Sequence, residues 1–140
     1  MEAPASAPQA DGEQVLGCVL FGGYYKDIAF TDRRVIQFEP FKQRWKFLMQ
    51  ALGPKRLVVD RETTIQDVLP FSKREIPREE ITRIEVKAHT RLARGRIRAV
   101  TTYGESVDLA RLDVDIEKDS YAELIALVRS IYPEMPKTID

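Results

Sequence analysis

The sequence predicts an α+β domain in which about seven antiparallel strands form a bent sheet, and a C-terminal helix covers it. Two patterns predict this fold class. Short apolar or alternating segments separated by turn residues recur from residue 13 to about residue 109, and one amphipathic helical segment follows them. The length of 140 residues fits a single hydrophobic core. A composition of 44% hydrophobic and 31% charged residues is typical of a globular chain.

The first three predicted strands follow one another closely. Residues 15–21 are apolar, and Gly22 and Gly23 then supply turn chemistry. Residues 25–30 resume the strand pattern, with Ile28 and Phe30 on one face. A polar turn at residues 31–33 precedes a third strand over residues 35–38. We expect these strands to pair antiparallel in sequence order.

Residues 41–52 instead show helical periodicity. Four apolar residues fall within a narrow arc at 100° per residue: Phe41, Trp45, Leu48 and Leu52. Lysines and glutamines occupy the opposite face, and Gly53-Pro54 ends the segment. The pattern predicts an amphipathic helix inserted after the third strand.

The middle of the chain is less regular. Residues 57–59 fit a short strand, whereas residues 63–69 fit either a strand or a helix. Residues 81–88 alternate between apolar and charged side chains, as in a half-buried antiparallel strand. Residues 96–102 and 106–109 form another predicted pair around a Tyr-Gly-Glu turn.

A helix ends the predicted domain. Ser120 and Glu123 have the spacing of a capping box, which predicts the start of the helix at Ser120. An apolar stripe follows, and Pro133 stops it. Its members are Tyr121, Leu124, Ile125, Val128, Ile131 and Tyr132. We therefore predict a disordered tail over residues 1–12, a domain over residues 13–133 with an insertion at about 41–72, and a C-terminal tail over residues 134–140.

Two segments resemble bacterial pleckstrin-homology-like (PH-like) domains. Residues 28–36 (IAFTDRRVI) resemble the hairpin between their second and third strands, and residues 76–86 (IPREEITRIEV) resemble the entry to their fifth strand. The hairpin of residues 96–109 and the helix from Ser120 follow in the same order. The insertion is longer than the usual loop of that family. The resemblance implies a partly open barrel that acts as a non-catalytic binding module through its loops or strand edges.

The residues required for catalysis are scarce. The only histidine, His89, lies beside basic residues, and the only cysteine, Cys18, lies inside an apolar strand. A disulfide within the chain is impossible, and no motif for a metal, a phosphate or a cofactor is present. The paired acids Glu79-Glu80 and Asp113/Asp115 fit solvated loops. We expect no catalytic residue, metal or cofactor.

The equal numbers of basic and acidic side chains conceal a basic middle. Residues 41–103 hold fifteen basic and seven acidic residues, whereas both flanking parts are acidic. Candidate residues for binding an anion, a lipid or a partner come from two clusters in this part: Lys42, Arg44, Trp45, Lys46, Arg91, Arg94 and Arg96. Two other interpretations remain open. The inserted helix would cover the core, and the arginines would form a solvated connection between strands.

The expected partner is an unknown protein or an anionic membrane surface. Nucleic acid is disfavoured because no aromatic residue lies between Lys87 and Arg98. A homo-oligomeric assembly subunit that uses exposed sheet edges and the inserted helix is one alternative, and a ligand carrier or enzyme with a closed cavity is another. The first residues lack the pattern of a secretory signal, so we expect a cytoplasmic protein that can also associate peripherally with a membrane.

Overall fold

The computed structural model describes residues 12–21, 26–39, 57–112 and 118–140. Its elements in chain order are β1 (Val15–Leu20), β2 (Asp27–Thr31), β3 (Arg34–Phe38), β4 (Val58–Asp60), α2 (Ile65–Val68), η2 (Leu69–Phe71), β5 (Ser72–Pro77), η3 (Arg78–Glu80), β6 (Ile81–Lys87), β7 (Gly95–Thr101), β8 (Ser106–Leu112), α3 (Lys118–Ser130) and β9 (Lys137–Ile139).

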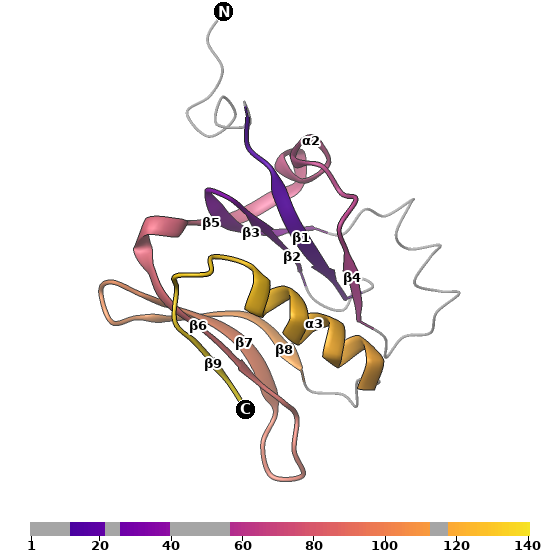
Figure 1. Ribbon diagram of the computed structural model, residues 1–140, viewed down its shortest axis with the longest axis vertical. Coiled ribbons are helices and arrows are strands. Elements are labelled where there is room, and N and C mark those ends of the chain that lie inside the picture. Colours follow the sequence, from indigo (N-terminus) through magenta and orange to yellow (C-terminus); the bar gives the residue numbers. More distant parts are fainter. Residues whose placement is uncertain (1–11, 22–25, 40–56, 113–117) are drawn as a thin grey trace, which may run out of the picture.

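The strands form two sheets, and α3 lies between them (Figure 1). The first sheet has the order β4-β1-β2-β3-β5, and the second has the order β8-β7-β6-β9. The predicted α+β class, rich in antiparallel sheet, is confirmed, and the arrangement is compatible with a partly open barrel. The described residues contain nine strands rather than about seven.

Both faces of the first sheet are covered, which explains why all five residues of β2 are buried. Ile28 and Phe30 pack in the large core with α3 and the second sheet. Ile36 and Phe38 lie on the opposite face, in a smaller core that includes residues of α2. Period-two alternation places successive side chains on opposite faces, so β1, β2 and β3 each contribute to both cores.

The second sheet has one core face and one solvent face. In β6, Ile84 and Val86 are buried, whereas Arg83 and Lys87 are exposed, as the alternation of residues 81–88 predicted. The strands predicted at 96–102 and 106–109 are β7 and β8, although β8 continues to Leu112.

Helix α3 begins earlier than predicted. It starts at Lys118, and Ser120 is a buried residue of its first turn, so the capping box predicted at Ser120 is wrong. The helix packs closely on β1 at Gly17, where an added Cβ would lie 2.5 Å from Leu127 Cδ1. Leu127 belongs to the buried face, although the predicted stripe omitted it.

Two edge strands were not predicted. The tail predicted over residues 134–140 contains β9, which pairs parallel with β6. Strand β5 pairs antiparallel with β3 from the far edge of the first sheet. Strand β5 carries three charged residues, β9 is only three residues long, and both bury little, so hydrophobic periodicity does not reveal them. Of the helices in the described ranges, none combines the length and apolar character needed to cross a membrane.

Candidate functional site

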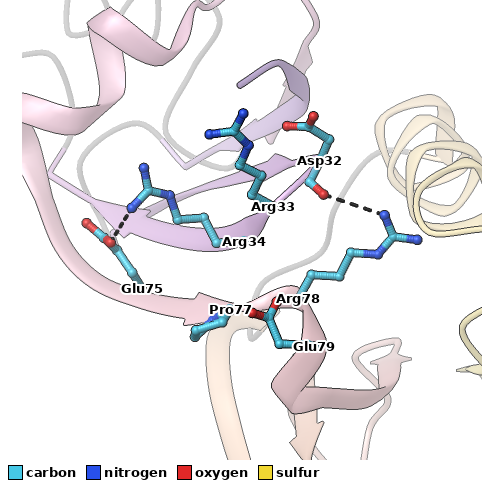
Figure 2. A pocket seen from close by; sticks show the side chains of 7 residues that line it. All are labelled: Asp32, Arg33, Arg34, Glu75, Pro77, Arg78 and Glu79. Atoms are coloured by element: carbon cyan, nitrogen blue, oxygen red, sulfur yellow. Dashed lines mark hydrogen bonds and ion pairs between the residues drawn. The ribbon is translucent and has the colours of Figure 1, made fainter. Parts of the chain in front are cut away.

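The first candidate site is a pocket of about 480 Å³ at the turn between β2 and β3 (Figure 2). It is lined by three arginines, three carboxylates and a proline: Asp32, Arg33, Arg34, Glu75, Pro77, Arg78 and Glu79. Arg34 Nη1 lies 2.6 Å from Glu75 Oε1, and the Arg78 guanidinium carbon lies 4.7 Å from the centre of the Tyr132 ring. The opposite charges balance, so the lining does not favour an anion over a cation.

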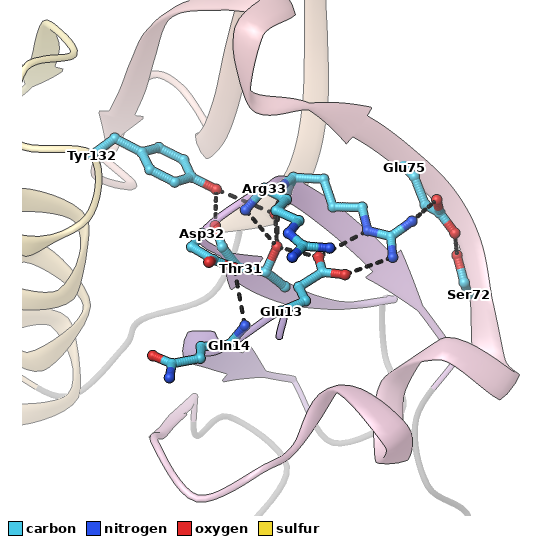
Figure 3. A network of polar contacts seen from close by, with 9 residues as sticks. Glu13, Gln14, Thr31, Asp32, Arg33, Ser72, Glu75 and Tyr132 are labelled. Carbon is cyan, nitrogen blue, oxygen red and sulfur yellow. Dashed lines mark hydrogen bonds and ion pairs between the residues drawn. The ribbon is translucent and has the colours of Figure 1, made fainter. Parts of the chain in front are cut away.

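The wall of this pocket is part of a buried polar network (Figure 3). Glu13 accepts two hydrogen bonds from Arg34, at 2.9 Å from Nε and 2.7 Å from Nη2. Thr31 donates its hydroxyl proton to Glu13 Oε2 at 2.6 Å, and the backbone N–H of Arg34 donates to the same hydroxyl at 2.9 Å. Tyr132 donates to the carbonyl oxygens of Thr31 and Arg34. These bonds join the start of β1, the β2–β3 turn and the end of α3, so we assign the network to folding.

Two other buried titratable groups, Cys18 and Asp27, lie in the first sheet. Burial raises the pKa of the Cys18 thiol to about 12, which disfavours the nucleophilic thiolate at neutral pH. Burial also raises the pKa of Asp27 to about 7. Asp27 Oδ1 accepts the N–H of Phe21 at 2.9 Å, while Oδ2 has no hydrogen-bond partner among the described residues. Neither group lines the pocket. In the part of the chain that is described, no three or more His, Cys, Asp or Glu side chains gather as metal ligands would.

The second candidate site is the hairpin that joins β6 to β7. It projects at the bottom of the view in Figure 1. The Thr90 N–H donates to the Ala93 carbonyl at 2.9 Å, which closes the turn. The Thr90 hydroxyl accepts the N–H groups of Ala93 at 3.0 Å and Leu92 at 3.3 Å. These bonds fix the tip of the hairpin, where Arg91 and Leu92 project.

An apolar side chain lies at that tip without cover. Leu92 is 98% exposed, the highest value among the large hydrophobic residues of the described chain that lie at the surface. Tyr103, at 78%, lies on the β7–β8 turn, at the opposite end of β7. Single exposed apolar residues are common on proteins, so the surroundings of Leu92 decide its meaning.

Those surroundings are basic, because the strand register gathers cations on the solvent face. Lys87 is the cross-strand partner of Arg96, and Arg96 is the partner of Arg111 on β8. All three are exposed, and none forms an ion pair with another described residue. The next row differs, because Arg98 pairs with Asp108 at 2.9 Å. We call Lys87, Arg91, Arg94, Arg96 and Arg111 the basic surface.

Gly95 permits the close approach of the two strands at the base of the hairpin. A Cβ at this position would lie 2.3 Å from the carbonyl oxygen of Lys87 and 2.6 Å from the backbone nitrogen of His89. Backbone atoms cannot yield as a flexible side chain can. The glycine therefore holds Lys87 and Arg96 side by side.

The structure brings together three of the seven residues predicted from sequence. Arg91, Arg94 and Arg96 are exposed on or beside the hairpin. The other four, Lys42, Arg44, Trp45 and Lys46, lie outside the described residues.

Three residues of the site, Lys87, Arg111 and Leu92, are not among the seven predicted ones, although Lys87 belongs to the same basic run of the sequence. Arg111 reaches the basic surface through a register shift between Ile97 and Arg98, which leaves Asp108 and Arg111 exposed with two buried residues between them. Sequence alternation cannot show this shift. Leu92 could have been identified as an apolar residue between Arg91 and Arg94 in a predicted loop.

Comparison with known proteins adds no relative: no family model, no curated protein and no solved structure matches the chain.

Proposed function

We propose that the chain is a non-catalytic binding module of PH-like type that associates peripherally with anionic membrane surfaces through the basic surface and Leu92. The order of the elements supports the PH-like part. Strands β1, β2, β3 and β5 pair antiparallel in this order in the first sheet, which β4 extends. Strands β6, β7 and β8 pair in order in the second sheet, which β9 extends, and helix α3 follows β8 in the chain.

The observation that carries the membrane part is the row Lys87–Arg96–Arg111, together with the exposed Leu92 at the tip of the β6–β7 hairpin. Like charges placed directly opposite each other destabilise a sheet. An external anionic surface would remove that repulsion. A lipid surface also accounts for Leu92, because its apolar side chain would enter the boundary between headgroups and acyl chains.

The expected energies suffice for reversible binding. Each Lys or Arg near an anionic leaflet contributes about 1 kcal/mol, so the five cations give about 5 kcal/mol. Burial of the Leu92 side chain adds about 2 kcal/mol. A total of about 7 kcal/mol corresponds to micromolar affinity.

Co-sedimentation with vesicles tests this function. Wild-type protein should bind vesicles of phosphatidylcholine mixed with phosphatidylserine, and added salt should weaken the binding because salt screens exposed charges. The double variant Arg96→Gln/Arg111→Gln should bind roughly thirtyfold more weakly, from about 1 kcal/mol for each charge. Leu92→Ser should also weaken binding without changing the charge.

Arg129→Gln is the matched control for Arg96→Gln. Arg129 is exposed on the last turn of α3, so the same net charge is lost far from the hairpin in sequence and on another element. Equal losses for Arg96→Gln and Arg129→Gln would show that net charge alone governs binding. Equal binding of wild-type protein to pure phosphatidylcholine vesicles would contradict the proposed electrostatic contact.

A further inference from the structure

The C-terminal strand β9 contacts the rest of the domain as a bound peptide would. Pairing with β6 covers only three positions, Ile84 with Lys137, Glu85 with Thr138 and Val86 with Ile139. It is parallel, whereas the other strand pairs of the described chain are antiparallel. No residue from 133 to 140 is buried. The segment therefore adds no fully buried residue to the large hydrophobic core.

The acceptor is the edge of β6 together with the adjoining face of α3. The Ile84 N–H donates to the Pro136 carbonyl at 3.2 Å, and the Ala88 N–H donates to the Asp140 carbonyl at 3.4 Å. The Val86 carbonyl accepts the N–H of Asp140 at 3.0 Å. These are backbone contacts, which an extended segment of almost any sequence can make.

Side-chain contacts add to these backbone contacts. Lys137 Nζ donates to the carbonyl oxygens of Ile131 and Tyr132, at 2.8 Å for Tyr132, where the C-terminus of α3 favours a cation. Partial burial lowers the pKa of Lys137, although the carbonyls hold its charged form in place. Met135 and Ile139 are half-buried against the large core.

On α3, Tyr121 and Ile125 are also only partly buried at the margin of that core, and the Tyr121 hydroxyl donates to the Asp140 carbonyl at 3.2 Å. The side chains that make these contacts follow one pattern: an apolar residue, a cation two positions later and a second apolar residue two positions after that.

We propose that the edge of β6 and the face of α3 form a binding groove for an extended segment of a partner protein, and that residues 135–140 occupy this groove within the same chain. The partner segment would lie parallel to β6 and carry the pattern apolar-x-Lys-x-apolar. An unoccupied β6 edge would leave the Ile84 and Ala88 amides and the Val86 carbonyl open to another strand. Binding of a partner segment at this groove does not depend on the membrane contact of the basic surface and Leu92.

The test uses the full chain with a weakened β9. Thr138→Pro removes a backbone N–H from the middle of β9, and Thr138→Ala is the control because the side chain of Thr138 is exposed. The probe is a fluorescein-labelled peptide of residues 133–140, read by anisotropy, and the same peptide with Lys137→Glu is its control. A covalently linked segment competes at an effective concentration of about millimolar, so we expect Thr138→Pro to bind the probe at least roughly tenfold more tightly than wild type.

Hydrogen exchange at Ile84 and Ala88 locates the binding. Their amides should lose protection in Thr138→Pro and regain it when the peptide binds. A folded variant with these amides exposed and no peptide binding would overturn the proposal. So would a dimer that exchanges β9 between two copies but does not bind the free peptide.

Native-state exchange on the wild-type protein tests the inference even if Thr138→Pro fails to fold. The amides of Ile84 and Ala88 should exchange by local opening, faster than those of Ile97 and Ala99 on the central strand β7. Equal rates would mean that β9 leaves only when the whole domain unfolds, and the groove would then not be available to a partner.

Discussion

The Arg34 guanidinium and the Glu13 carboxylate form a two-point ion pair inside the fold, with N–O distances of 2.9 and 2.7 Å. The side chain of Glu13 is fully buried, and that of Arg34 is 8% exposed. The pair joins Glu13, two residues before β1, to the first residue of β3. The Glu13 carboxylate also raises the pKa of Arg34 above its ordinary value, so this arginine stays charged.

The two partners should respond unequally to replacement. Arg34→Gln leaves the buried Glu13 charge without its cation, and we expect a loss of about 3–5 kcal/mol in the free energy of unfolding. Glu13→Gln should cost less, because Glu75 still pairs with Arg34 at 2.6 Å. Urea denaturation of both variants and the double variant gives the coupling energy. Equal costs for the two single variants would contradict this asymmetry.

Asp27 should make the domain less stable as pH rises. Its folded pKa of about 7 lies above the unfolded value of about 4, so between these values the folded state holds the extra proton. The free energy of unfolding therefore falls from about pH 4 to about pH 7 by up to about 4 kcal/mol from this group. Burial is the main cause of the raised pKa of Asp27, and repulsion from the Glu39 carboxylate adds to it.

Asp27→Asn should remove that slope, because an amide does not ionise and its oxygen can still accept the Phe21 N–H. The measurement is urea denaturation of both proteins at a series of pH values, and the difference between them isolates Asp27 from other titrating groups. A difference that does not change between pH 4 and pH 7 would show that Asp27 is ionised throughout.

Sequence patterns predicted the strands with apolar runs or regular alternation and the helix with an apolar stripe. Strands β1, β2, β3, β6, β7 and β8 all follow the predicted alternation or apolar runs, and the terminal helix follows its apolar stripe. Strand β5 was missed because Ile76 is its only buried residue and ion pairing of Glu75 helps to hold it. No local pattern identifies Glu13 as a buried ion-pair partner, because Arg34, the cation that pairs with it, comes 21 positions later.

The candidate site could be predicted in part, from the charge run alone. Arg91, Arg94 and Arg96 are close in sequence, so their proximity in space needed no tertiary information. Arg111 joins them only through the β7–β8 register, and its pairing with Arg96 depends on an irregularity in that ladder. Long-range pairing of this kind is set by packing of the whole sheet rather than by local residue preferences.

A side chain at position 17 should lower the stability of the domain while Leu127 is present. An added Cβ would lie 2.5 Å from Leu127 Cδ1, in the contact between β1 and α3. Gly17→Ala should therefore reduce the free energy of unfolding by about 1–3 kcal/mol through overpacking. Leu127→Ala removes the methyl group that the added Cβ would meet. The double variant should therefore be more stable than the sum of the two single effects predicts. Additive effects in denaturation would show that β1 and α3 do not meet here.

The ordered tip of the hairpin should contribute to membrane affinity. Thr90→Val removes the hydroxyl that accepts the Leu92 and Ala93 N–H groups but leaves every charge and Leu92 in place. A loosened tip must lose more conformational freedom on binding, so we expect several-fold weaker binding to vesicles that contain phosphatidylserine. Thr90→Ser keeps the hydroxyl and should bind as wild type does. If valine and serine variants bind equally well, then charge and hydrophobicity alone explain the affinity, and the turn at Thr90 serves only the fold.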